Sequence, residues 1–448
     1  MKSLSLLHLG DVHYPETRHG AAVIDDKDPG FSAALKARVS PHRLTAVMAT
    51  IRRLAENQAD LGGVLLSGDL TTNAKVGEYK ECIQYLQKCF GGLQPWESDG
   101  LHVVPGNHDV NRSKIPLPGS DDEPDPVPHA DSLEKFEEFR TAWAEIGRPI
   151  LAVDAVRVTE LNASGCRLPV ISLNSCLGCG EYRRLPARFQ KAYISLLSET
   201  KTGRADHRDL VEQLDTPAFD DTHLADIAST LSGIPSSVPA VVLAHHGLLP
   251  QAVPRVAPYS EVINAGIARY RFAGCNKPII YCHGHIHESA VEILSHPEGG
   301  RRPLVTVSAP VLDAGFNLIS FYFTDTGLVL GCEVTRYVFQ NYGDVTPMEP
   351  IRIPLGDRDE PEYASDALSV RIGKVLSRKA TRFHALFAAV KSQSADVEET
   401  VEEAGLANAS PAEDEVVERL REMEWLGVVE ITARVQAHKH WILRRRLV

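Results

Sequence analysis

The sequence predicts an α/β fold in which two sheets form a sandwich flanked by helices, followed by a small α+β domain. Three observations predict it: apolar runs of strand length recur, helical segments fall between them, and several runs end in similar polar residues. Runs nearly continuous in Val, Ile and Leu suit strands that are buried on both faces. Alternating strands and helices are typical of layered α/β domains.

Six apolar runs are expected to form strands that end in polar residues: 3–9, 62–67, 101–104, 168–173, 239–244 and 278–282. A helix is predicted to about residue 57 from Ser40-Pro41, a cap followed by a first-turn proline. A second helix is predicted over 77–90, and strand-like runs within 303–338 would complete a second sheet. Residues 111–130, rich in Pro and Asp, are expected to form a loop at the rim of the site.

The chain of 448 residues favours more than one domain. A segment rich in Pro and charged residues lies near 345–365, as is typical of linkers. The expected organisation is therefore a large domain over 1–345, a linker over 346–365 and a second domain over 366–448.

The second domain is predicted to contain three helices (366–391, 395–404 and 412–425) and two strands (427–434 and 437–447). This order resembles a winged-helix module. Its third helix, which such modules place in the DNA major groove, carries six acidic residues against Arg419 and Arg421. Phosphates would repel that surface, although Lys439 and Arg444 to Arg446 could contact phosphate through the wing. A role in binding a protein or in self-association is therefore favoured over DNA binding.

The composition points to a cytoplasmic protein outside the membrane. The net charge of −12 makes nucleic-acid binding over the whole surface unexpected. The eight cysteines are scattered in a long chain, which favours a reducing compartment. We see no cleavage signal at the N-terminus and no apolar stretch long enough to cross a bilayer.

Asp, Asn and His residues follow the ends of the predicted strands: Asp11, His13, Asp69, Asn107, His245, His285 and His287. Layered α/β folds place ligands at the carboxyl ends of their strands, so these side chains are expected to share one site. Oxygen and nitrogen ligands of these kinds suit Mn, Fe, Zn, Co or Ni, and we expect manganese first. Their number is sufficient for two divalent metal ions.

The ordered blocks Asp11-x-His13, Gly68-Asp69, Gly106-Asn107-His108-Asp109, His245 and Gly284-His285-x-His287 resemble those of the calcineurin-like metallophosphoesterases. The resemblance covers roughly residues 3–325 and implies a four-layer fold with a dinuclear metal centre. Each block alone is a weak signal, whereas all five in order, each after an apolar run, are highly specific.

The resemblance also implies a role for each residue. The first metal would be bound by Asp11, His13 and His287, and the second by Asn107, His245 and His285, with Asp69 bridging both. A bridging hydroxide would attack phosphorus in line. His108 would stabilise the phosphoryl oxygens or protonate the leaving group, and Asp109 would orient His108.

Some residues near these blocks have more than one interpretation. Either His245 or His246 could be the ligand, and His245 is favoured because it follows the strand directly. His283 is expected to point into the sheet, and Asn174 and Ser175 are at least as well explained as structural residues. Cys176-x-x-Cys179 is interpreted as structural because no second CxxC accompanies it. A zinc equivalent beyond the expected two would contradict that interpretation.

The predicted function is metal-dependent phosphoester hydrolysis, with a phosphodiester of a nucleotide or nucleic acid as the substrate. The alternatives are a phosphomonoesterase or protein phosphatase, a DNA nuclease, and a sensor or scaffold that retains its metals without catalysis. Specificity is expected to come from the loops 14–39, 110–135 and 178–235.

Overall fold

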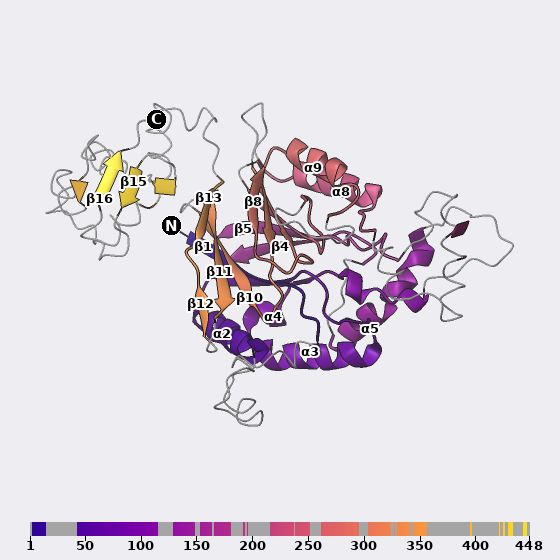
Figure 1. Ribbon diagram of the computed structural model, residues 1–448. Helices are drawn as coiled ribbons and strands as arrows, with labels where there is room; N and C mark the ends of the chain where they lie inside the picture. Colours follow the sequence, from indigo (N-terminus) through magenta and orange to yellow (C-terminus); the bar gives the residue numbers. More distant parts are fainter. Residues whose placement is uncertain are drawn as a thin grey trace, which may run out of the picture.

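The computed structural model shows two sheets packed against each other, with helices on both outer sides (Figure 1). Residues 2–14, 43–114, 129–147, 153–163, 165–180, 216–236, 238–250, 261–294, 303–323, 329–340 and 344–355 are described, with the short pieces 191–192, 195 and 327. In the C-terminal part the described residues are 395–396, 421, 424–425, 429–432 and 442–445.

The first sheet has seven strands. In spatial order they are β12 (Val345–Pro347), β11 (Val329–Phe339), β10 (Gly315–Phe323), β1 (Lys2–Leu9), β2 (Leu61–Leu66) and β3 (Leu101–Val103), with β13 (Ile351–Pro354) also paired to β11. β1, β2 and β3 are parallel, whereas β10 and β11 are antiparallel to their neighbours. The carboxyl ends of the three parallel strands therefore lie at one edge of the sheet.

The second sheet has six strands. Their order is β4 (Arg157–Ala163), β5 (Cys166–Ser172), β6 (Ala240–Leu243), β7 (Ile279–His283), β9 (Leu304–Ser308) and β8 (Val291–Leu294). β5, β6, β7 and β9 are parallel, and an antiparallel strand closes each edge. The parallel strands are fully or almost fully buried, as the continuous apolar runs predicted.

Helices cover the outer side of each sheet (Figure 1). The first sheet is covered by α2 (Arg43–Asn57), α3 (Val76–Phe90), α4 (Gln94–Glu97) and α5 (Glu137–Glu145), and the second by α8 (Asp221–Ser232) and α9 (Ala265–Gly274). Short 3-10 helices η2 (Asn107–Asp109), η3 (Arg112–Lys114) and η4 (His129–Phe136) follow β3. The layered α/β fold predicted from the sequence is confirmed.

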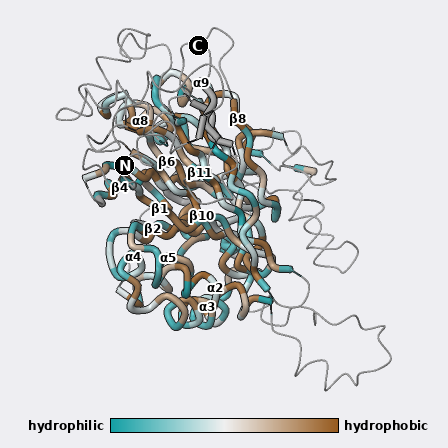
Figure 2. The backbone as a smooth tube through the Cα atoms, turned by 90° about the vertical axis from the view of Figure 1, so that its left-hand side faces the viewer, coloured by the Kyte–Doolittle hydropathy of each residue, from teal (hydrophilic) through white to brown (hydrophobic). Residues whose placement is uncertain are grey.

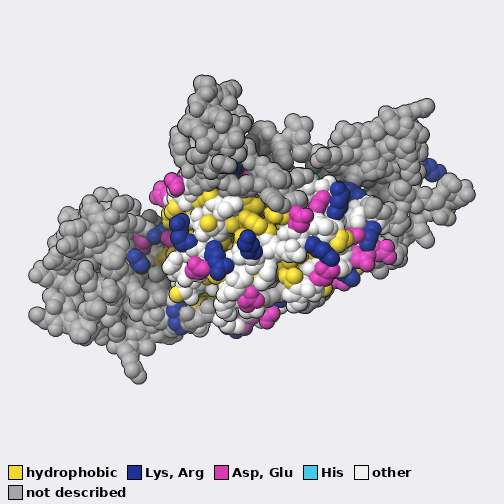
Figure 3. Space-filling model, turned by 90° about the horizontal axis from the view of Figure 1, so that it is seen from below, with side chains coloured by type: hydrophobic (Ala, Val, Ile, Leu, Met, Phe, Trp, Pro, Cys, Tyr) yellow, Lys and Arg dark blue, Asp and Glu magenta, His cyan; other side chains and the backbone are white. Residues whose placement is uncertain are grey.

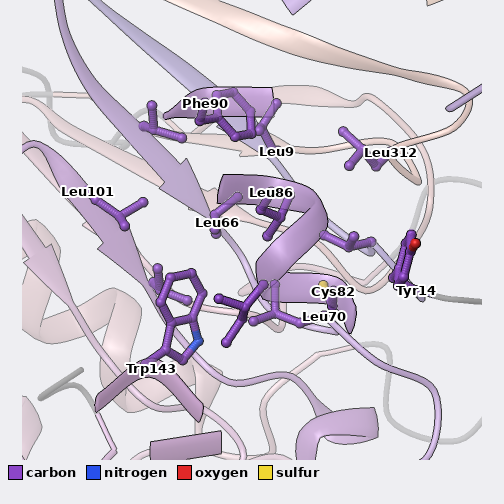
Figure 4. Close-up of a cluster of buried hydrophobic side chains, with 14 of the residues drawn as sticks. Leu9, Tyr14, Leu66, Leu70, Cys82, Leu86, Phe90, Leu101, Trp143 and Leu312 are labelled. Carbon is purple, nitrogen blue, oxygen red and sulfur yellow. The ribbon is translucent and has the colours of Figure 1, made fainter. Parts of the chain in front are cut away.

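Three hydrophobic clusters hold the layers together. On β1, Leu7 and Leu9 face the helices, while Leu4 and Leu6 belong to the cluster between the two sheets. This alternation follows from the two-residue repeat of a strand. Figure 4 shows the cluster on the helix side, where Leu9 and Leu66 lie near Leu86 of α3. Figure 2 shows how strongly the apolar residues concentrate in the central strands.

At the C-terminal end, the structure differs from some of the elements expected from the sequence. The segment that was expected to begin the linker forms β12 and β13, which extend the first sheet. Residues 395–396, expected to start a helix, form β14 (Ala395–Asp396). β14 joins β16 (Ile442–Arg445) and β15 (Val429–Thr432) in a small sheet, so both strands predicted at the C-terminus are present. The helix 366–391 and most of 412–425 lie outside the described residues, and the winged-helix module stays a prediction.

Two further observations bear on the sequence-based expectations. All eight cysteines are free thiols, and seven of them are buried. Among the described helices, none combines the length and apolar character that a membrane crossing requires.

Candidate metal centre

The candidate ligands gather where the parallel strands of both sheets end. Asp11 and His13 follow β1, Asp69 follows β2, and Asn107 begins η2 after β3. The other three follow strands of the second sheet: His245 after β6, and His285 and His287 after β7. The seven residues therefore come from five strand ends, as the sequence predicted from the carboxyl ends of parallel strands.

The backbone at these strand ends adopts an uncommon conformation. Seven described non-glycine residues have positive φ, and five of them are candidate ligands: Asp11, His13, Asp69, His285 and His287. The left-handed region costs an ordinary residue about 1–3 kcal/mol unless its surroundings hold it there. Here the turn after β1 is held by the turn after β2, because the Asp11 and His13 amides donate to the carbonyls of Gly68 and Asp69.

A first group of ligand atoms consists of Asp11, His13, Asp69 and His287, which lie within 4.8 Å of one another. The Nε2 atoms of His13 and His287 are 3.2 Å apart, and His287 Nε2 is 3.5 Å from Asp11 Oδ1. The His285 amide donates to both oxygens of the fully buried Asp11 carboxylate, at 3.0 Å each. Two carboxylates and two imidazoles at this spacing can hold one divalent cation.

A second group converges on the side-chain oxygen of Asn107. Its Oδ1 lies 2.9 Å from His245 Nε2 and 3.1 Å from His285 Nδ1. Asp69 connects the two groups, because its Oδ2 is 3.4 Å from His245 Nε2 and 3.8 Å from His13 Nε2. One carboxylate between two ligand groups is the arrangement that a dinuclear centre requires.

Two glycines allow the strand ends to approach each other closely. Gly68 has φ +96°, and a Cβ there would lie 2.6 Å from the Gly106 nitrogen. At Gly106 a Cβ would lie 2.1 Å from Asp69 Oδ1. Both blocks therefore need glycine for steric reasons, since a side chain at either position would displace the neighbouring turn.

Asp69 and His245 form a buried pair with unusual electrostatics. Burial alone would raise the pKa of the Asp69 carboxyl, but His245, His108 and His13 together hold that pKa well below its usual range. Burial disfavours charge on His245, but the nearby Asp69 and Asp11 carboxylates raise its pKa to about 10. The carboxylates thus attract positive charge. Divalent cations would supply this positive charge in place of the protons on the histidines. Their binding would release those protons, because metals bind neutral imidazole and ionised carboxylate. The donor set fits two such ions.

The structure corrects the role that was expected of Asp109. Its carboxylate does not orient His108. Instead, His108 Nδ1 lies 3.0 Å from the Thr72 carbonyl oxygen. Asp109 Oδ2 accepts hydrogen bonds from the amides of Gly106 and Leu70, at 2.9 and 3.2 Å, and the Tyr79 hydroxyl donates to Oδ1 at 3.0 Å. Asp109 therefore joins the turn after β2 to the turn after β3.

The two adjacent histidines after β6 point in different directions. His245 faces the ligand groups, and its Nδ1 lies 2.7 Å from the Ser67 carbonyl oxygen. His246 Nδ1 faces Ser175 Oγ at 3.0 Å and Cys176 Sγ at 3.8 Å. The carbonyls of Ser67 and Thr72 carry no sequence signal, because a backbone oxygen is the same at every position. His283 is buried and bonded to the Gly284 carbonyl oxygen.

The profile of the calcineurin-like phosphoesterase family matches residues 4–289, which includes every candidate ligand. The chain belongs to the calcineurin-like phosphoesterases. This phosphoesterase is therefore a hydrolase of a family with dinuclear metal centres, and its sheets and ligand groups agree with that membership. No curated protein matches its sequence.

Similar solved structures include phosphatases and nucleotidases. A dimetal phosphatase from Danio rerio is 10% identical, with a TM-score of 0.43, over 79% of this chain and 99% of that one. A 5'-nucleotidase precursor from Thermus thermophilus is 12% identical, with a TM-score of 0.33, over 87% and 66%. The phosphopantetheinyl hydrolase of Mycobacterium tuberculosis is 15% identical, with a TM-score of 0.34, over 69% and 90%. Likenesses at this level say nothing about the substrate.

Proposed function

We propose that this phosphoesterase hydrolyses a phosphodiester of a nucleotide or nucleic acid with two divalent metal ions, manganese first among them. The position of Asp69 carries the proposal. Its Oδ2 lies between His13 Nε2 and His245 Nε2, and so connects the two ligand groups. A carboxylate shared in this way is what two ions a few ångströms apart need.

Each ion would be held by a separate set of side chains. Asp11, His13 and His287 would hold one ion, Asn107, His245 and His285 the other, and Asp69 both. His245 is preferred to His246 because only His245 reaches Asn107 and Asp69. When bound, such ions supply a strong nucleophile from water near neutral pH and neutralise charge on the phosphoryl group.

His108 is proposed as the residue that meets the substrate's phosphoryl or leaving oxygen. Its ring packs edge-on against His13, with centroids 5.1 Å apart, so it lies beside the first ligand group. Because Nδ1 faces the Thr72 carbonyl oxygen, that carbonyl holds a proton on Nδ1. Nε2 is then the nitrogen that would face the leaving oxygen; as the imidazolium, the ring would donate its Nε2 proton there and be left in the neutral Nδ1–H form.

The charge of the site supports a diester over a monoester. The neighbours that most strongly lower the pKa of Asp69 are His245, His108 and His13, and the proposed ligands among them, His245 and His13, are neutral when they bind metals. A phosphomonoester dianion needs more compensating positive charge than a diester monoanion does. On the helix-covered face seen from below, Lys, Arg, Asp and Glu side chains are interspersed (Figure 3). The described residues on that face form no continuous basic surface. Together with the net charge of −12, this makes a nucleotide diester our preferred substrate over a nucleic acid.

The test compares two chromogenic substrates in the presence of manganese. We expect turnover of bis-p-nitrophenyl phosphate to exceed that of p-nitrophenyl phosphate. Asp69→Asn should lower kcat at least about 100-fold, because charge stabilisation by the metals is lost. The matched control is Asp99→Asn, since Asp99 is 91% exposed and paired with Arg157. A panel of cyclic nucleotides, dinucleotides, DNA and phosphopeptides then identifies the substrate class.

Several results would contradict the proposal. Full activity of Asp69→Asn, or no turnover by folded protein with any divalent ion, would disprove the enzymatic role of the site. A preference for the monoester would overturn the diester assignment. Efficient cleavage of DNA alone would favour the nuclease alternative.

A further inference from the structure

Two buried thiols lie beside the metal centre, on a loop that the proposed hydrolysis does not use. Cys176 and Cys179 follow β5, and both are fully buried, as is His246. Their ligand atoms lie within 4.8 Å of one another, although His246 is 70 residues from Cys176 in the sequence. Cys176 Sγ is 3.8 Å from His246 Nδ1. Two thiols and one imidazole are a ligand set for a zinc-like ion.

The loop that carries the two thiols is held rigidly. The Cys179 amide donates to the Cys176 carbonyl at 3.0 Å, which closes the turn between the cysteines. The Cys176 amide donates to Asn174 Oδ1 at 2.7 Å. The buried Lys135 ammonium donates to the carbonyls of Leu177 and Cys179, at 2.8 and 2.9 Å. The thiols are thus preorganised, which lowers the entropic cost of binding an ion.

His246 offers a neutral nitrogen to the thiols. Ser175 Oγ accepts the amides of His245 and His246, so its one hydrogen is left for His246 Nδ1. The lone pair of Nδ1 therefore accepts the Ser175 hydrogen in the absence of an ion, and a bound ion would take the place of that hydrogen. The other nitrogen, Nε2, is buried without a hydrogen-bond partner in the described part of the chain.

We propose that Cys176, Cys179 and His246 form a third metal site, distinct from the dinuclear centre, which binds zinc or a similar thiophilic ion. In a tetrahedral zinc site, bonds of ~2.3 Å to sulfur and ~2.0 Å to nitrogen place those two ligand atoms about 3.5 Å apart. The observed separation of 3.8 Å between Cys176 Sγ and His246 Nδ1 needs only a small adjustment. Water can complete the coordination, as in zinc sites with three protein ligands.

Binding of an ion would change the protonation of the buried thiols. In the absence of an ion, burial and the neighbouring Cys179 raise the pKa of the Cys176 thiol well above its usual range. A cation reverses this preference, because metals bind the thiolate and displace its proton.

The third site would hold two ligands of the dinuclear centre in place through His246. The ring of His246 contacts the rings of both His245 and His285, with centroids 4.7 and 4.4 Å away. Fixing His246 would therefore restrict two ligands of the second ion. Residues that orient metal ligands typically change metal affinity about 10–100-fold when they are replaced.

The test measures metal content and cobalt spectra of the full chain purified under reducing conditions. We expect the wild type to retain one zinc equivalent more than Cys176→Ala/Cys179→Ala. Cys332→Ala is the matched control, because Cys332 is equally buried but lies on β11. Cobalt should give thiolate-to-metal charge-transfer absorption in the wild type and in Asp69→Asn, but not in the double variant. His246→Gln, a milder change, should weaken the same absorption.

The Asp69→Asn protein separates this site from the proposed catalytic centre. Its thiolate–cobalt absorption should persist whether or not the dinuclear centre and its hydrolytic activity exist as proposed. Equal zinc content in the wild type and the double variant, together with no thiolate–cobalt absorption, would overturn the third site. The third site would also be overturned if the metal-free wild type, purified under reducing conditions, showed two fewer titratable thiols than its sequence contains. That result would indicate a disulfide.

Discussion

At the scale of single residues, Asp109 is the clearest example of a side chain that acts through its neighbours. Its buried carboxylate joins the amides of Leu70 and Gly106 and the hydroxyl of Tyr79. Burial and the charge of Asp69 raise the pKa of Asp109 to about 6, although these hydrogen bonds oppose the shift. Asp109 therefore joins the turns that carry Asp69 and Asn107.

Tyr79→Phe tests this positioning. We expect the free energy of unfolding to fall by about 1–3 kcal/mol, because a hydrogen bond to a buried carboxylate is lost. kcat should fall more than metal content does. Urea denaturation and metal analysis measure the two effects. Tyr270→Phe, at a residue that is 79% exposed, should change neither. An unchanged stability of Tyr79→Phe would show that Asp109 does not depend on this hydroxyl.

The buried His102 on β3 is expected to make the stability of the protein depend on pH. Burial, followed by the charge of Arg157, lowers its pKa from 6.5 to about 3. Neither ring nitrogen has a partner in the described part of the chain. The unfolded chain binds a proton below pH 6.5 while the folded protein does not, so this contribution to stability is present above pH 6.5 and is lost as the pH falls toward 3.

Replacing His102 by leucine should remove this loss of stability at low pH. Between pH 7 and 5, the wild type should lose about 2 kcal/mol more stability than His102→Leu, since one pKa unit corresponds to about 1.4 kcal/mol. Denaturant titrations at both pH values measure the difference. His223→Leu on α8 is the control and should keep the acid sensitivity of the wild type. Parallel pH dependence of His102→Leu and wild type would contradict this account.

At the scale of elements, the turns after the strands determine the site. The turns after β2 and β3 touch each other, because Gly106 lies against the backbone and carboxylate of Asp69. These turns carry the ligands themselves, so a small shift of a turn moves a ligand directly. Their left-handed ligands and close glycines make them sensitive to a single added methyl group.

Gly106→Ala is therefore expected to lower activity at least about 100-fold, since misplacing a catalytic group by about 1 Å has such an effect. Retained metal should fall as well. Gly77→Ala on α3 is the matched control, because a Cβ there meets no atom within 4 Å. That change should leave activity intact and stability equal or slightly higher. Normal activity of Gly106→Ala would show that the two turns can separate without loss.

At the scale of the whole molecule, the C-terminal part contacts the first sheet through Trp425. Its ring lies 5.5 Å from the Tyr322 ring of β10, and the Arg352 guanidinium of β13 lies 5.6 Å from the Trp425 ring centroid. Arg352 also donates to the Glu424 carboxylate at 3.0 Å. The acidic residues of the predicted third helix thus include one, Glu424, that pairs within the chain.

Trp425→Ala should loosen this contact. We expect faster amide hydrogen exchange in β13 and β15, because the aromatic and cation–π contacts are lost, while β1 stays unchanged as an internal reference. Tyr270→Ala, which removes an exposed aromatic residue, is the control. Identical exchange in Trp425→Ala and wild type would show that the C-terminal part is held by other contacts. Hydrolytic activity should persist, since Trp425 lies outside the ligand groups.

The sequence by itself determined the layered fold and the residues that gather at its strand ends. A buried parallel strand is a continuous apolar run, and its polar successor, such as Asp11 or Asp69, must emerge at the carboxyl edge. Both signals are local, so they can be found without knowing the strand order. The seven candidate ligands come together for that reason, and their assignment to individual metals stays a proposal.

Only the tertiary structure decided which groups meet across long separations. The partner of His108 is a backbone carbonyl, which no residue type reveals, and Asp109 turned out to bind the neighbouring turns. The return of β13 to β11 depends on which sheet edge is free, so the expected linker instead begins with strands. Cys176 and His246 likewise become neighbours only because β5 and β6 are adjacent. Contacts of this kind depend on the order of strands in space, which local sequence patterns do not encode.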